Sequence, residues 1–363
     1  MEAWLTSEWQ RNGPWQLFLR PISWLFGLLV WLRRGAFRAG LLKSYSVGVP
    51  VIIVGNISVG GTGKTPLVLA LVERLTQHGV HCGIVTRGYQ RRSIEVKLNV
   101  IHAVSANMQD AVVSDEATLL ARRSGVPVYA AANRVAAAKT LLGNHVEVDV
   151  IVSDDGLQHY ALRRDIEICV IDGERGLGNG GLLPAGPLRE PASRLRTVDA
   201  IVVNCARTGA AHGKRFSAST AAFDMSLANE HFVNLNTNRC IGLNDAVAAF
   251  QGKDIHAMAG TGHPQRFFSH LVSLGFQLTT MQAFPDHHDY RESDLSGTDA
   301  EIILMTEKDA VKCGSFADER MWFMRIDAVL SNDFTDFVLK KLSARKACPC
   351  HSIRSFLKFS FVR

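Results

Sequence analysis

The chain has 363 residues, of which 47% are hydrophobic, and its formal net charge is +6. This length and apolar content allow a sizeable core in one large domain or in two smaller ones. The seven cysteines follow no framework spacing, which excludes a disulfide-stapled scaffold and indicates a reducing compartment. Basic charge gathers in residues 1–45 and after Asp336, as expected for a chain that meets a nucleic acid or an anionic membrane surface.

The first 45 residues are typical of a segment that associates with a membrane. Five of the six tryptophans lie within residues 1–31, and arginines bracket the apolar run 21–32. This run is shorter than the roughly 20 residues that span a bilayer, and no small-residue cleavage site follows it. We therefore expect a helix that lies in the bilayer interface, with a core helix of the globular part as the alternative.

A glycine-rich turn then joins the apolar run 51–54 to the helix-compatible stretch 66–77, as in a phosphate-binding loop. The turn ends in Gly63, Lys64 and Thr65; Lys64 can reach the outer phosphates, and the Thr65 hydroxyl can bind magnesium. Ser58 stands where such loops usually have their first glycine, and Gly60 and Gly61 supply the flexibility instead. The residues expected to contact nucleotide are Ser58, Val59, Gly60, Gly61, Thr62, Gly63, Lys64 and Thr65.

Three segments further along carry charge at the ends of expected strands. Arg87 and Tyr89 end one strand and suit a phosphate-bearing substrate, or else form a solvated basic turn. Asp115 begins a helix-compatible stretch, where it can serve catalysis or cap the helix. Asp154 and Asp155 follow the apolar run 148–153, so either can hold magnesium, although Asp-Asp-Gly is also common in turns.

A later loop brings together Asp286, His287, His288 and Asp289. Neighbouring histidines rarely bind one metal ion, and no third ligand has a suitable spacing, so a histidine paired with a carboxylate base is a better interpretation than a zinc site. The charged segment 305–309 ends another strand, and we expect it to cap a helix.

Alternating strand and helix patterns from Val51 onward predict a P-loop NTPase-like, doubly wound, mostly parallel α/β sheet. A second, smaller α/β domain is expected after about residue 234, and the weakly periodic region 217–238 can hold the linkage. The expected strands are 51–54, 82–86, 126–130, 148–153, 166–171, 200–204, 254–259, 276–281, 301–306 and 321–326. The expected divisions are a membrane-associating segment at 1–45, a P-loop core at 46–233, a carboxy-terminal domain at 234–342 and a basic tail at 343–363.

Together these segments resemble the tetraacyldisaccharide 4′-kinase family, from the amino-terminal apolar segment to about residue 342. The motifs that carry the resemblance are specific in combination, although no single one is. They are residues 55–66, 86–89, 115–116, 154–159, 178–179, 182–191, 264–268, 284–288 and 305–310. The tail 343–363 matches nothing in the family.

The resemblance implies transfer of the γ-phosphate of ATP, with Mg²⁺, to the 4′-hydroxyl of a tetraacyldisaccharide 1-phosphate, which forms lipid IVA in lipid A biosynthesis. It also implies a peripheral enzyme on the cytoplasmic face of the inner membrane, with the lipid substrate and the bilayer as partners and with no nucleic acid or protein partner.

A regulatory P-loop NTPase and a nucleic-acid-binding ATPase are the alternative functions. The absence of an Asn-Lys-x-Asp motif weighs against a GTPase, and the lack of a stacking platform weighs against nucleic acid.

The resemblance assigns roles to residues as well. Asp115 would be the general base, with His287, or else His288, as its partner, and Lys64 would complete the catalytic set. The metal ligands would be Thr65, Asp155, Asp154 and, more weakly, Glu190. Arg87 and Tyr89 stay weaker candidates for contacts with the substrate.

Overall fold

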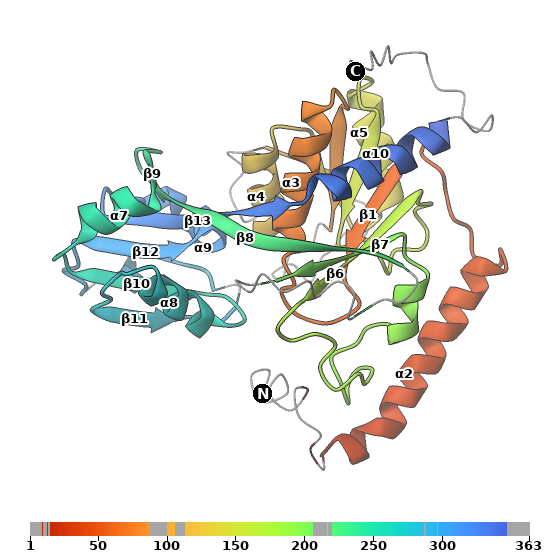
Figure 1. Cartoon of the computed structure of the whole chain (residues 1–363), viewed down its shortest axis with the longest axis horizontal. Coiled ribbons are helices and arrows are strands. Elements are labelled where there is room, and N and C mark those ends of the chain that lie inside the picture. The colour runs from red at the N-terminus through yellow and green to blue at the C-terminus, as the bar shows by residue number, and fades with distance from the viewer. Residues whose placement is uncertain are drawn as a thin grey trace.

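One mixed β-sheet runs through the molecule and carries helices on its faces (Figure 1). The computed structural model describes residues 9, 13, 15–87, 100–105, 113–205, 216, 220–286, 288–295 and 297–346. The strands are β1 (Val51–Gly55), β2 (Cys82–Thr86), β3 (His102–Val104), β4 (Val128–Ala130), β5 (Val150–Asp154), β6 (Ile166–Asp172), β7 (Ala200–Asn204), β8 (Ala221–Asn234), β9 (Cys240–Gly242), β10 (Ile255–Ala259), β11 (Thr280–Ala283), β12 (Ile302–Thr306) and β13 (Met321–Leu330). The helices are α2 (Trp15–Arg38), α3 (Lys64–Gln77), α4 (Asp115–Ser124), α5 (Arg134–Asn144), α7 (Leu243–Phe250), α8 (Pro264–Ser273), α9 (Glu307–Cys313) and α10 (Asn332–Lys346), with the short 3-10 helices η1 (Ala192–Arg196), η2 (Glu292–Leu295) and η3 (Gly314–Phe316).

The half of the sheet that carries the glycine-rich loop is parallel, as predicted, apart from an edge strand. Its strand order is β7-β6-β1-β5-β2-β4-β3, and β3 pairs antiparallel with β4. Strand β1 lies between β5 and β6, so that Val54 is opposite both Asp154 and Ile168. Because parallel strands end at the same edge of a sheet, the loop after β1 lies next to the carboxylates that follow β5.

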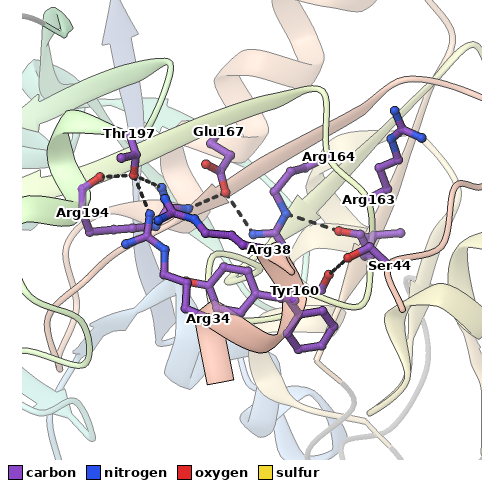
Figure 2. A pocket seen from close by; sticks show the side chains of 11 residues that line it. Arg34, Arg38, Ser44, Tyr160, Arg163, Arg164, Glu167, Arg194 and Thr197 are labelled. Carbon is purple, nitrogen blue, oxygen red and sulfur yellow. Dashed lines mark hydrogen bonds and ion pairs between the residues drawn. The ribbon is translucent and has the colours of Figure 1, made fainter. Parts of the chain in front are cut away.

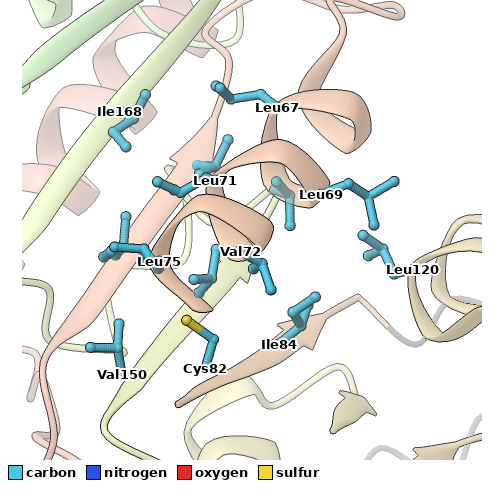
Figure 3. Packing of buried hydrophobic residues seen from close by; sticks show 14 of the residues in the cluster. Leu67, Leu69, Leu71, Val72, Leu75, Cys82, Ile84, Leu120, Val150 and Ile168 are labelled. Atoms are coloured by element: carbon cyan, nitrogen blue, oxygen red, sulfur yellow. The ribbon is translucent and has the colours of Figure 1, made fainter. Parts of the chain in front are cut away.

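Each face of this half has its own buried core, because alternate residues of a strand point to opposite sides. Ile52 and Val54 pack with the apolar face of α3, whereas Val51 and Ile53 pack on the other side with α5. Figure 3 shows the first core, in which Leu71 and other leucines of α3 lie beside the strands. Burying one such side chain contributes about 1.5–3 kcal/mol, so the two cores together fix the position of the loop between β1 and α3.

A long antiparallel strand pair joins this half to the second half (Figure 1). The first residues of β8 pair in parallel with β7, and the rest of β8 pairs antiparallel with β13. The linkage expected near residues 217–238 is therefore a continuous strand over most of that region. After β13, helix α10 returns to the first half, where Phe334, Val338 and Leu342 are buried in the core formed with α3. The predicted domain boundaries themselves stay a prediction.

Most predicted elements agree with the structure within a few residues. The strands predicted at 82–86 and 200–204 coincide with β2 and β7. The strand predicted at 276–281 is wrong in its placement, since β11 begins only at Thr280 and Phe276 is buried in the core of the second half. The region 178–191 has no helix and only isolated bridges, and it is rich in glycine and proline, which disfavour regular structure.

Helix α2 turns its polar side toward the protein and its apolar side outward. Its buried residues are Gln16 and Ser23, and the Ser23 hydroxyl donates to the carbonyl oxygen of Leu182 at 2.9 Å. The exposed large side chains are Trp15, Leu17, Phe18, Ile22, Trp24, Leu25, Leu28, Leu29, Trp31 and Leu32. The helix has 24 residues and, by length and composition alone, meets what a bilayer-crossing helix requires. The length of the run 21–32 therefore does not by itself exclude spanning, and the interfacial placement of the helix stays a prediction.

Candidate active site

The loop between β1 and α3 offers a row of backbone N–H groups. Within the described part of the chain, no protein group accepts a hydrogen bond from the N–H groups of residues 60–65. Because α3 begins at Lys64, the last of these groups lie at a helix N-terminus, where the helix dipole is positive. Free N–H groups and a positive helix end together make a site for phosphate.

Two glycines of the loop have backbone conformations that other residues rarely adopt. Gly60 has φ +101° and Gly63 has φ +89°, both in the left-handed region. A Cβ atom on Gly63 would lie 2.6 Å from Asn204 Nδ2 and 3.1 Å from Met225 Cε. A Cβ atom on Gly61 would meet no described residue within 4 Å beyond its two chain neighbours. Thus Gly63 is required by both conformation and space, whereas Gly61 is not.

Side chains outside the loop bind its carbonyl oxygens. Asn204, at the end of β7, donates to the carbonyl oxygen of residue 62 at 3.3 Å, and Arg175 donates to that of residue 61. Arg175 is held by Asp172, at the end of β6, with Nε 2.9 Å from Oδ2. Asp172 also pairs at 3.2 Å with Arg266, from α8 in the second half. No local sequence pattern marks Arg175 or Arg266 as part of the site, whereas Asp172 and Asn204 share one signal, a polar residue at the carboxyl end of a buried strand.

Asp155 lies between cations beside the loop. Lys64 Nζ is 3.6 Å from its Oδ1, and Arg189 Nη1 is 3.4 Å from its Oδ2. Burial alone would raise the pKa of Asp155, but Lys64, Arg189 and Arg134 together lower it below its ordinary value. The carboxylate is therefore ionised at neutral pH and directed toward the lysine of the loop.

Asp154 is buried, and its Oδ1 has no hydrogen-bond partner among the described residues. Burial raises the pKa of Asp154 to about 7, against the opposing effect of Lys64. Carboxylate oxygens are preferred magnesium ligands, and a bound cation would satisfy this oxygen, so Asp154 and Asp155 fit such an ion. No three His, Cys, Asp or Glu side chains converge on a metal position in the described ranges. Further ligands would therefore be the Thr65 hydroxyl, water and nucleotide phosphates.

The N-cap of helix α4 is Ser114 and not Asp115. The cap of α4 is Ser114, whose side chain accepts a hydrogen bond from the N–H of Ala117 at 3.4 Å. Asp115, 13% exposed in its side chain, instead has Oδ2 3.1 Å from Lys312 Nζ. Lys312 is on α9, so Asp115 lies where the two halves of the molecule meet. The sequence left catalysis and capping open for Asp115, and the structure assigns the cap to Ser114.

The histidine loop lies beside the same helices. Lys308 of α9 is 3.2 Å from Asp286 and 4.0 Å from Glu116. His288 Nε2 is 3.0 Å from Asp294 Oδ2, so the described partner of His288 is not Asp115. His287 lies outside the described residues, and its pairing with Asp115 stays a prediction. The segment 305–309 caps a helix as predicted, since the Thr306 side chain accepts from the Asp309 N–H at the start of α9.

The remaining predicted site residues have different surroundings. Glu190 is buried and accepts hydrogen bonds from Tyr160 at 2.7 Å and from Gln158 at 2.9 Å, while Arg194 Nε lies 3.2 Å away. These contacts favour a role in holding the region 178–191, and metal ligation by Glu190 stays a prediction. Arg87 is exposed at the end of β2, and Tyr89 lies outside the described residues.

Comparisons with known proteins agree with one another. A family model described as Tetraacyldisaccharide-1-P 4'-kinase matches residues 15–343. The chain is 47% identical over 341 residues to a tetraacyldisaccharide 4'-kinase of Methylobacillus flagellatus, covering 94% of this chain and 96% of that protein. It is 42% identical over 343 residues to one of Shewanella halifaxensis, covering 94% and 98%. A crystal structure of LpxK from Aquifex aeolicus in complex with ATP is similar with a TM-score of 0.75 and 28% identity, covering 90% of this chain and 99% of that chain.

Proposed function

Because the chain belongs to the tetraacyldisaccharide 4′-kinase family, we propose that Lys64, Asp115 and the carboxylates after β5 carry its reaction. The enzyme is a kinase that transfers the γ-phosphate of ATP to the 4′-hydroxyl of a tetraacyldisaccharide 1-phosphate in lipid A biosynthesis. The observation that supports the site most strongly is the row of N–H groups at residues 60–65 that have no acceptor among the described residues, at the N-terminus of α3 where Lys64 lies.

The loop would bind the β- and γ-phosphates through its N–H groups, and Lys64 would offset their charge. Asp155 lies 3.6 Å from Lys64, so its carboxylate keeps the ammonium group close to the phosphates before nucleotide binds. Thr65, Asp155 and Asp154 would hold Mg²⁺, which when bound neutralises negative charge on the phosphates during transfer. Glu190 is a weaker candidate because its carboxylate already has three protein partners.

Asp115 would accept the proton of the 4′-hydroxyl. As the hydroxyl oxygen bonds to the γ-phosphorus, the bond from that phosphorus to the bridging oxygen breaks and ADP leaves. Lys312, 3.1 Å from Asp115, holds the carboxylate in position across the boundary between the two halves. His287 would share this role with Asp115, and Arg87 and Tyr89 would contact the phosphate-bearing substrate.

We further propose that the enzyme lies on the cytoplasmic face of the inner membrane without crossing it. Contacts of α2 with the rest of the protein recur along its whole length, at Gln16, Ser23, Gly27, Arg34 and Phe37. A helix held at intervals of three, four and seven residues lies along the protein instead of projecting from it. Its outward apolar face would then enter the bilayer interface beside the lipid substrate.

The test compares two neighbouring substitutions at the start of α4. Asp115→Asn should lower kcat about 10²–10⁴-fold with little change in the KM for ATP, because it removes a base and no phosphate contact. Ser114→Ala should cost about 1 kcal/mol of stability through loss of the cap and leave kcat within a fewfold. Steady-state kinetics and thermal unfolding of both variants distinguish a catalytic role of Asp115 from a role in helix stability. If Asp115→Asn keeps its kcat, Asp115 is not the base.

A further inference from the structure

A basic pocket lies where helix α2 ends (Figure 2). Its cavity has a volume of about 250 Å³ and is lined by Arg34, Arg38, Arg163, Arg164 and Arg194, and Glu167 is the acidic residue among the described residues of the lining. Arg34 and Arg38 come from the last turns of α2, and the others come from the sheet half that carries the active site. This pocket plays no part in the phosphoryl transfer proposed above.

The positive charge of the pocket is only partly neutralised. Glu167 Oε1 pairs with Arg164 at 3.0 Å and also with Arg194. Arg34 has a neutral partner, the Thr197 hydroxyl, at 2.8 Å. Within the described residues, no carboxylate pairs with Arg34, Arg38 or Arg163. Arg34 and Arg38 therefore leave positive charge in the hollow that attracts an anion, and Arg163 adds charge at its edge.

The guanidinium groups are also arranged to receive a ligand. Figure 2 shows Arg34 beside Thr197 and Arg194 on one side of the pocket, while Arg163 points away at its edge. Arg194 is fixed by Glu167 and by its 2.7 Å hydrogen bond to Thr197, so this side of the pocket is rigid. A planar guanidinium group donates two parallel hydrogen bonds to phosphate oxygens, which makes arginine better suited than lysine to hold such a group.

The position of the pocket indicates where the anion comes from. Trp31 and Leu32 on α2, one turn or less before Arg34, are 67% and 50% exposed. An apolar helix face of this kind enters an interface by about 5–10 Å, which brings the adjoining arginines to the level of the lipid phosphates. The cavity has the volume of roughly eight water molecules at about 30 Å³ each, enough for a headgroup phosphate, while acyl chains would lie against the outward face of α2.

We propose that this pocket binds the phosphodiester headgroup of an anionic phospholipid and so fixes the end of α2 at the membrane surface. The ligand is a bilayer lipid and is distinct from the lipid that is phosphorylated. Arg34 and Arg38 make the contacts that depend on α2, and Arg194 and Arg164 provide the fixed side of the pocket.

The test uses the full-length enzyme and two double variants of equal charge. Arg34→Gln with Arg38→Gln removes two pocket arginines; Arg20→Gln with Arg33→Gln removes two exposed arginines of the same helix that do not line the pocket. Sedimentation measures the partition of each protein onto phosphatidylcholine vesicles with and without phosphatidylglycerol. Diffuse attraction to an anionic surface changes binding by about fivefold per arginine, and it does so equally in both variants.

If the pocket binds the headgroup, the pocket variant, Arg34→Gln with Arg38→Gln, should lose about tenfold or more of its partition onto vesicles with phosphatidylglycerol, beyond the loss seen in the control variant. Partition onto phosphatidylcholine alone should be unchanged in both variants. Thermal unfolding and activity on substrate in neutral micelles should stay near wild type, which establishes that the variants are folded. Equal losses in the two variants would overturn the proposal in favour of diffuse charge. A second experiment measures the melting temperature of each protein with increasing inorganic phosphate. A saturable rise in the wild type that the pocket variant lacks would overturn the lipid assignment in favour of a site for free phosphate.

Discussion

Lys312 Nζ lies 3.1 Å from Asp115 Oδ2, and the two residues come from opposite halves of the molecule. Lys312 is almost fully buried and also lies 5.7 Å from the centre of the Tyr290 ring and 4.0 Å from Asp309. The proposed base is therefore anchored to the half that does not carry the nucleotide loop. Movement between the halves would change the position of this carboxylate.

Lys312→Met should lower kcat by about tenfold or more, because the carboxylate of Asp115 would lose the cation that holds it. Binding of ATP should be little affected, since Lys312 touches no part of the loop. Lys312→Arg should recover part of the activity by restoring a cation at this position. The measurement is kcat and the KM for ATP in all three proteins. Loss of ATP binding without loss of kcat in Lys312→Met would contradict the positioning role.

Two glycines of the loop, Gly63 and Gly61, allow a matched comparison of alanine substitutions. Gly63→Ala should lower the melting temperature and weaken ATP binding, because its φ is +89° and the new Cβ would approach Asn204 Nδ2 to 2.6 Å. Gly61→Ala should keep a near wild-type melting temperature, because among the described residues no atom apart from those of its chain neighbours lies within 4 Å of its Cβ position. Thermal unfolding without nucleotide measures this difference. Equal destabilisation of the two variants would mean that the loop conformation is not the one described.

Local sequence patterns were sufficient to predict the glycine-rich loop between β1 and α3 and most strands of the first half, while the contacts of this loop with nucleotide stay a prediction. Residues 51–77 form strand, loop and helix consecutively, so their spacing alone predicts the fold and the role of Lys64. The partners of the site come from distant parts of the chain, and no local pattern encodes such pairs. Arg175 at the loop carbonyl and Lys312 at Asp115 were therefore missed. The polar side of α2 was missed for the same reason, since Ser23 is recognisable as a contact only once the region 178–191 lies against it.

The outward face of α2 should control membrane binding without contributing to the fold. Replacing Trp24 and Leu25, which are 72% and 59% exposed, with Gln should reduce partition onto vesicles at least tenfold and leave thermal unfolding in detergent unchanged. Ser23→Leu, on the inward side, should instead lower the melting temperature and leave partition onto vesicles unchanged, since it removes hydrogen bonds with Leu182 and Ala185. Sedimentation and thermal unfolding of each protein measure both effects. A loss of stability in the outward variant would mean that this face packs against protein.

His159 should make the protein less stable in acid. Burial, with the charges of Arg134, Arg164 and Arg33, lowers the pKa of His159 to about 4, whereas it is about 6.5 in an unfolded chain. Between these values the unfolded chain binds a proton that the folded chain does not, so stability falls as the pH falls from about 6.5 to about 4. Denaturant unfolding at pH 5 and pH 7 should show a smaller pH difference for His159→Gln than for the wild type. An unchanged difference would mean that other groups account for the acid sensitivity.

The most direct test of the account follows the γ-phosphate itself. ATP radiolabelled in its γ-phosphate is mixed with excess enzyme and tetraacyldisaccharide 1-phosphate in micelles, and label in the lipid is counted over a single turnover. The wild type should transfer the label to the 4′-position, and Lys64→Ala should do so at least about a hundredfold more slowly, because losing charge stabilisation of this kind costs on the order of 3 kcal/mol or more. Transfer at a near wild-type rate by Lys64→Ala would contradict the role of Lys64, and release of the label as free phosphate by the wild type would contradict transfer to the lipid.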